Sequence, residues 1–118
     1  MKIKVPFIRK TIFGNILKHR NVNFVFNIAV LEAACERLKI DFHEMSNVDN
    51  YDFALAVLYE AYLQGCKQRY KKPKYSFHRA VFWNEYMSRE SSEQVKRAMV
   101  DLLGKMKKGD KGSGVKKK

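Results

Sequence analysis

The side chains in this sequence that could catalyse a reaction or hold a metal are few and scattered. His19, His43 and His78 stand alone, and neither Cys35 nor Cys66 belongs to a C-x-x-C pair, whereas a structural zinc site needs clustered ligands. A nucleophilic cysteine needs a positioned base, and both cysteines lie in apolar stripes where a thiolate is disfavoured. The glycine-rich motifs that bind nucleotide phosphates are also missing. We therefore expect reduced, packed thiols, no metal, no cofactor and no enzymatic activity.

A basic segment with interleaved aromatic residues is one candidate for a binding site. Residues 67–79 carry six cationic side chains and no acidic one, together with Tyr70, Tyr75 and Phe77. Cations neutralise phosphates and aromatic rings stack on bases, so this composition suits single-stranded nucleic acid or an acidic protein surface. The residues expected to make these contacts are Lys67, Arg69, Lys71, Lys72 and Lys74. A solvated connector between two helices would have the same composition.

An aromatic surface for protein binding is the second candidate. The stretch from residue 50 to residue 65 holds more large rings than one face of a short helix can bury in so small a domain. Exposed rings there would favour association with a partner helix or with a second copy of the chain. Packing against the N-terminal segment is the alternative. The side chains expected to form this surface are Phe53, Val57, Tyr59, Tyr62 and Trp83.

Length and charge limit the class of protein. The chain has 118 residues, enough for one domain, and no run reaches the roughly 18 apolar residues that a membrane helix needs. Its first ten residues lack the apolar stretch of a secretion signal, which favours a cytoplasmic location. The net charge of +12 is concentrated at the two ends, because residues 1–20 and residues 104–118 contribute +6 each. We expect a non-membrane protein with basic extensions.

Apolar residues at period two predict a short β-hairpin at the N-terminus. They recur over residues 3–7 and again over residues 22–26, and the turn signal Gly14-Asn15 lies between them. Residues 12–17 also fit one helical turn, which would interrupt or replace the hairpin.

The rest of the chain has the periodicity of helices. The stretch from residue 50 to residue 65 is apolar around most of its circumference, so we expect a central helix there that ends near Gly65. A short helical turn is expected over residues 41–46. The N-caps expected for the other helices are Asn27, Ser76 and Ser91.

These patterns predict a mainly α fold, a small helical domain of four to five helices with a short N-terminal β-hairpin. The domain is expected to span residues 1–103. Residues 104–118 have too few apolar groups to offset an ordering cost of about 1–2 kcal/mol per residue, so we expect a flexible Lys/Gly-rich tail.

The order of these elements resembles the tail assembly chaperones of long-tailed phages and the related gene transfer agent proteins. In that family a strand leads into a helix with a Leu-Glu pair, then a short helix and an apolar central helix. The likeness covers about residues 22–65. The matching residues of the first helix are Phe26, Ile28, Leu31, Glu32 and Leu38, and those of the central helix are Ala56, Val57, Leu58, Tyr59, Ala61, Tyr62 and Leu63.

The resemblance implies a function in virion assembly without catalysis. Such a protein binds apolar helical segments of the tape measure protein, prevents their aggregation, and helps to recruit tail tube subunits in the host cytoplasm. An amphipathic helix needs an apolar groove, and many copies along a long helix gain from avidity. The alternative that we carry forward is a small basic nucleic-acid-binding module.

Overall fold

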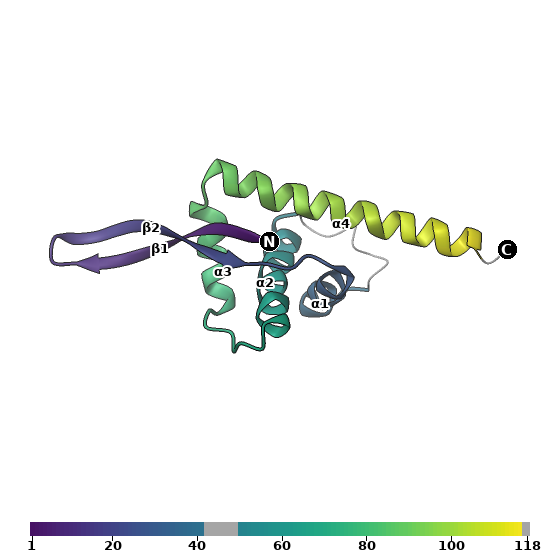
Figure 1. The fold of residues 1–118 in the computed structure, drawn as a ribbon, viewed down its shortest axis with the longest axis horizontal. Helices are drawn as coiled ribbons and strands as arrows, with labels where there is room; N and C mark the ends of the chain where they lie inside the picture. The colour runs from purple at the N-terminus through teal and green to yellow at the C-terminus, as the bar shows by residue number, and fades with distance from the viewer. Residues whose placement is uncertain (42–49, 117–118) are drawn as a thin grey trace.

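A hairpin and four helices make up the described part of the molecule (Figure 1). The computed structural model describes residues 1–41 and 50–116, with side chains over 1–41 and 51–105. The elements are β1 (Lys2–Thr11), β2 (Gly14–Asn23), α1 (Ile28–Leu38), α2 (Asn50–Gln68), α3 (Phe77–Tyr86) and α4 (Arg89–Lys116). This is the mainly α architecture with an N-terminal hairpin that the sequence predicts. Apart from Asp41, the turn expected over residues 41–46 lies outside the described residues.

The hairpin is longer than expected and projects from the helical body (Figure 1). Its register runs without interruption from the pair Lys2 and Asn23 to the pair Thr11 and Gly14. No helical turn replaces it over residues 12–17. The chain turns between Thr11 and Gly14, just before the Gly14-Asn15 turn that the sequence suggests. In this turn the Thr11 hydroxyl donates to the Gly14 carbonyl at 2.7 Å and accepts from the Phe13 N–H at 3.2 Å. Gly14 itself has a φ of 116°, which L side chains rarely adopt.

The second strand ends earlier than the apolar alternation suggests. Phe24 and Phe26 lie beyond β2, which stops at Asn23. The backbone there turns to the helices, since the Val25 N–H donates to the Ala61 carbonyl at 3.1 Å. Phe24 is fully buried and contacts Trp83 edge to face, with the ring centroids 5.7 Å apart. The predicted strand over residues 22–26 is therefore correct only in its first half.

Helix α2 is the central helix that the sequence predicts, because seven of its residues between 55 and 62 are buried. It packs against α1, α3 and β2. The expectation that Gly65 ends it is wrong, since the helix continues to Gln68. A Cβ atom at Gly65 would lie 2.6 Å from the Asn23 carbonyl oxygen, so glycine is needed there for close approach to the end of β2.

The helix caps agree with the sequence in part. Asn27 caps α1 as predicted, because its side chain accepts from the Val30 N–H at 3.1 Å. Ser76 precedes α3 but makes no capping bond through its side chain. The prediction that Ser91 caps the last helix is wrong. Helix α4 already begins at Arg89, and the Ser88 hydroxyl accepts from the Ser91 N–H at 3.1 Å.

The last helix also extends beyond Gly104, where the apolar pattern predicts its end. Its backbone is helical to Lys116. Lysine is a good helix former, which favours continuation of the helix into this Lys-rich stretch. The flexibility of residues 104–118 stays a prediction.

Candidate functional site

Four of the five side chains expected to form an exposed aromatic surface lie in the core. Val57 and Trp83 are 1% exposed, Tyr62 is 4% exposed and Tyr59 is 8% exposed. Phe53 is half-buried against the same core. The reason is that α2 has neighbours on several sides, so its rings pack within the domain. Val57, Tyr59, Tyr62 and Trp83 are therefore not exposed, and the alternative of internal packing describes them, whereas the Tyr51 ring of the same helix is 47% exposed. Protein binding by these residues stays a prediction.

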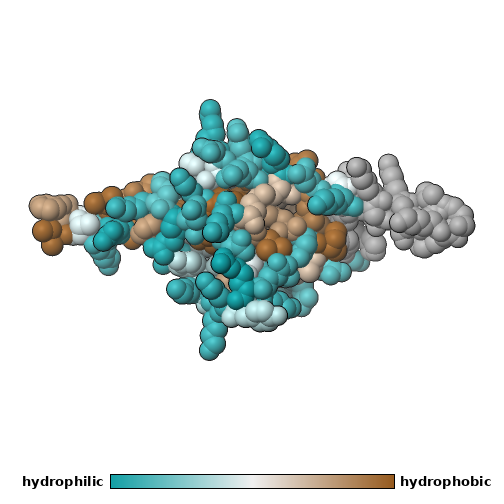
Figure 2. Space-filling view, in the orientation of Figure 1, coloured by the Kyte–Doolittle hydropathy of each residue, from teal (hydrophilic) through white to brown (hydrophobic). Residues whose placement is uncertain are grey.

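Exposed apolar side chains gather on the hairpin instead. Figure 2 shows apolar surface at the free end of the hairpin, on the left of the view. Ile12 and Phe13, at the reversal, are more than nine-tenths exposed, and Ile8 pairs with Leu17 on the adjoining strands. We call this surface the hairpin tip. It consists of Ile8, Ile12, Phe13, Ile16 and Leu17.

Both faces of the hairpin contribute to this tip. Side chains of paired residues share a face and successive side chains alternate, so Ile8 and Leu17 lie on one face and Ile16 lies on the other. Arg9, the partner of Ile16, and the neighbouring Lys10 and Lys18 are exposed and cationic. The hairpin tip is thus an apolar surface within a basic ribbon.

The sequence contained a signal for the hairpin tip that the helical interpretation of residues 12–17 obscured. Apolar residues directly beside a turn, on a sheet with only two strands, have no second layer to cover both faces. That combination marks exposed apolar surface once the hairpin is accepted.

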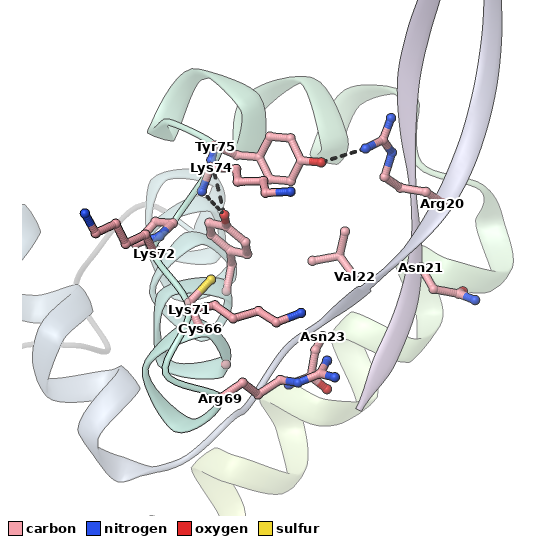
Figure 3. Close-up of a pocket in the computed structure, with 13 residues that line it drawn as sticks. Arg20, Asn21, Val22, Asn23, Cys66, Arg69, Lys71, Lys72, Lys74 and Tyr75 are labelled. Carbon is pink, nitrogen blue, oxygen red and sulfur yellow. Dashed lines mark hydrogen bonds between the residues drawn. The ribbon is translucent and has the colours of Figure 1, made fainter.

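Four of the six cations of the 67–79 segment line a cavity of about 600 Å³ between β2, the end of α2 and the following loop (Figure 3). No acidic side chain of the described residues lines it. We call it the basic cavity. Its cationic residues are Arg20, Arg69, Lys71, Lys72 and Lys74. Of the predicted contact residues only Lys67 is not among those lining the cavity, and Arg20 is an addition that sequence reasoning missed.

Two tyrosine hydroxyls of α2 position the loop that bears these cations. The Tyr62 hydroxyl accepts from the Lys74 N–H at 2.6 Å and from the Tyr75 N–H at 3.1 Å. The Tyr59 hydroxyl donates to the Tyr75 carbonyl at 2.9 Å. Burial raises the pKa of Tyr62, so its hydroxyl stays protonated. The loop is therefore fixed to the central helix through its backbone.

Arg20 joins the base of the hairpin to the same loop. Its guanidinium donates to the Tyr75 hydroxyl at 2.9 Å and lies over the Phe7 ring, with Cζ 3.9 Å from the centroid. The Tyr75 ring in turn packs edge to face on Trp83. The cation at position 20 is thus held in place at the cavity rim.

The thiols are unpaired, as expected. Cys35 is buried, and burial raises the pKa of its thiol. Cys66 is half-buried and lines the basic cavity. In the described residues, no group of three or more His, Cys, Asp or Glu side chains could hold a metal ion.

None of the described helices combines the length and apolar character needed to cross a bilayer.

Comparisons with family models, with curated proteins and with solved structures found no match to this chain. The arguments for a function therefore come from its own two surfaces, the hairpin tip and the basic cavity.

Proposed function

We propose that this chain is a tail assembly chaperone of long-tailed phages. It would bind apolar helical segments of the tape measure protein and help to recruit tail tube subunits, without catalysing a reaction. The observation that carries the proposal is the hairpin tip, five large apolar side chains exposed on one projecting element. Large apolar side chains exposed together on one element are typical of protein-binding sites. The order of the elements, a hairpin followed by a capped helix and an apolar central helix, is consistent with the family resemblance.

The hairpin tip replaces the buried rings of α2 as the contact surface in this proposal. An amphipathic helix presents apolar side chains at i, i+3, i+4 and i+7, and such a stripe can lie against an apolar ribbon. Ile12 and Phe13 provide the most accessible apolar atoms. Each contact would be small, but several copies bound along one long helix would gain strength by avidity.

Co-expression with the tape measure protein tests the proposal. The test partner is the long helical protein that the proposal expects to be encoded beside this chain. The wild-type chain should keep that protein soluble, and the double variant Ile12→Ser with Phe13→Ser should lose most of this effect. The matched control is Tyr70→Ser with Val100→Ser, because both residues are exposed and neither belongs to the hairpin. A tip variant that protects the partner as well as the wild type does would refute the proposal.

Nucleic-acid binding is the second candidate, and the basic cavity is the observation that favours it. Lys71, Lys72 and Lys74 lie on one loop within reach of a single polyanion. Phosphate contacts would give an affinity that falls steeply with salt. Substitution of these three lysines by alanine should then abolish retention of a single-stranded oligonucleotide, and retention that survives the substitution would rule this candidate out.

A further inference from the structure

The outer edge of β2 opens into the basic cavity. The sheet in the described residues has two strands, so no third strand pairs with that edge. An edge strand of this kind presents unpaired backbone N–H and C=O groups. At Asn23 the edge is covered, because its carbonyl lies against Gly65 of α2, so the accessible part of the edge lies before Asn23. Residues 20–23 line one side of the cavity, and loop residues 69–75 lie on the opposite side (Figure 3). The strand edge therefore faces a walled space rather than open solvent.

The opposite wall of this space is strongly cationic. Arg69, Lys71, Lys72 and Lys74 are exposed, and no carboxylate among the lining residues offsets their charge. Like charges around one cavity repel each other, and an anionic occupant lowers this energy. Arg20 adds a further cation on the side of the strand. The charge of the cavity thus selects an acidic occupant.

We propose that the basic cavity binds an extended acidic segment of a partner protein. The segment would add a third strand to the outer edge of β2, and its carboxylates would pair with the lysines of the loop. Backbone hydrogen bonds supply affinity in this mode of recognition, and the side chains supply specificity. Since every second side chain of a strand points the same way, acidic residues at alternate positions would face the cationic wall.

The structure of the loop favours this mode because its position is already fixed. Its backbone at Lys74 and Tyr75 is held by the hydroxyls of Tyr59 and Tyr62. A wall that is ordered before binding loses little conformational entropy when the ligand arrives. The distance between the strand edge and the lysines is therefore set by the fold and not by the ligand.

An acidic peptide fits this cavity better than a nucleic acid does. Among the residues that line the cavity, Tyr62 and Tyr75 have rings that pack edge to face on Trp83, so these rings are engaged inside the domain. Tyr70 is 98% exposed on the same loop, but it is not among the lining residues. The Tyr75 hydroxyl is already bonded to Arg20. Base stacking needs open aromatic faces, whereas strand addition needs an open backbone edge. The site uses none of the hairpin-tip residues, so it can be tested separately from the chaperone proposal.

Fluorescence anisotropy with the full-length chain tests the inference. The probe is a labelled peptide of four Glu-Thr repeats, compared with a peptide of four Gln-Thr repeats and with an oligo-dT of eight nucleotides. The acidic peptide should bind about tenfold more tightly than either comparison probe. The double variant Lys71→Ala with Lys74→Ala should weaken its binding about tenfold. The control Lys4→Ala with Lys10→Ala removes the same charge from exposed positions on the hairpin and should leave binding nearly unchanged.

Backbone methylation separates strand addition from simple charge attraction. An N-methyl group removes the backbone donor that a strand needs. Two versions of the acidic peptide are therefore made, one methylated on its odd-numbered residues and the other on its even-numbered residues. At least one version should bind about tenfold more weakly than the parent peptide. The inference is overturned if both bind like the parent, or if the hairpin control loses as much affinity as the loop variant. Tighter binding of the oligo-dT would overturn it in favour of nucleic acid.

Discussion

The contact between Gly65 and Asn23 predicts a large and specific effect of one methyl group. A Cβ atom at position 65 would lie 2.6 Å from the Asn23 carbonyl oxygen and 3.2 Å from its carbonyl carbon. Both are backbone atoms, so they cannot rotate out of the way. Either α2 or the end of β2 must shift, and overpacking of this kind costs about 1–3 kcal/mol. Alanine returns about 0.5–1 kcal/mol through its better helix propensity, so Gly65→Ala should lower the free energy of unfolding by up to about 2.5 kcal/mol.

Gly104→Ala is the matched control for this prediction. Gly104 lies in α4, and a Cβ there would have no heavy atom within 4 Å. The control keeps only the helix-propensity term and should gain about 0.5–1 kcal/mol. Urea unfolding can be followed by the fluorescence of Trp83, the single tryptophan, which is buried in the core. If Gly65→Ala is as stable as Gly104→Ala, α2 does not pass Asn23 this closely, and the described wall of the basic cavity is wrong.

Three further substitutions and one control, Ser76→Ala, test a helix cap, the loop contact of Tyr62 and an ion pair. Asn27→Ala removes the cap bond to Val30 and should cost about 1 kcal/mol of unfolding free energy, whereas Ser76→Ala, which loses no side-chain cap bond, should cost much less. Tyr62→Phe leaves two backbone N–H groups without their acceptor and should cost about 1–3 kcal/mol, measured by urea unfolding. Burial raises the pKa of Tyr62 above the value of about 10 that an unfolded tyrosine has. The contribution of this shift to stability is therefore complete well below pH 10 and is lost as the pH rises through and above this value. In that range the wild type should lose stability more steeply than Tyr62→Phe. Arg37→Gln breaks the 2.7 Å ion pair with Glu60 and should cost at most about 1 kcal/mol, with a smaller effect at high salt.

Local signals predicted the elements whose structure depends on nearby residues. The Asn27 cap needs only the amide of Val30, three residues away, and it forms as predicted. The apolar circumference of α2 likewise predicted its central place. Gly65 misled the same reasoning, because its role is set by Asn23, a residue far away in the sequence. A glycine that ends a helix and a glycine that admits a neighbour look alike until that neighbour is known.

The candidate surfaces were predicted to different degrees for the same reason. The cations of the loop are adjacent in sequence, so composition alone grouped Lys71, Lys72 and Lys74. Arg20 joins them only through the hairpin register and its bond to Tyr75, which no local pattern contains. The sequence left open whether the rings of α2 lie at the surface or pack internally, because the neighbours that cover them come from α1, α3 and the hairpin.

The separation of the two surfaces follows from how the hairpin is anchored. A two-stranded ribbon is marginally stable alone, so its base must be held by the domain. Ile3, Val5 and Val22 are buried there, and Arg20 bonds to the loop through Tyr75. Beyond that anchor the strands leave the core, so the apolar side chains at the far end are exposed, most of all Ile12 and Phe13. The same anchor holds the edge of β2 against the basic cavity, and one ribbon therefore presents an apolar surface at its tip and a charged one at its base.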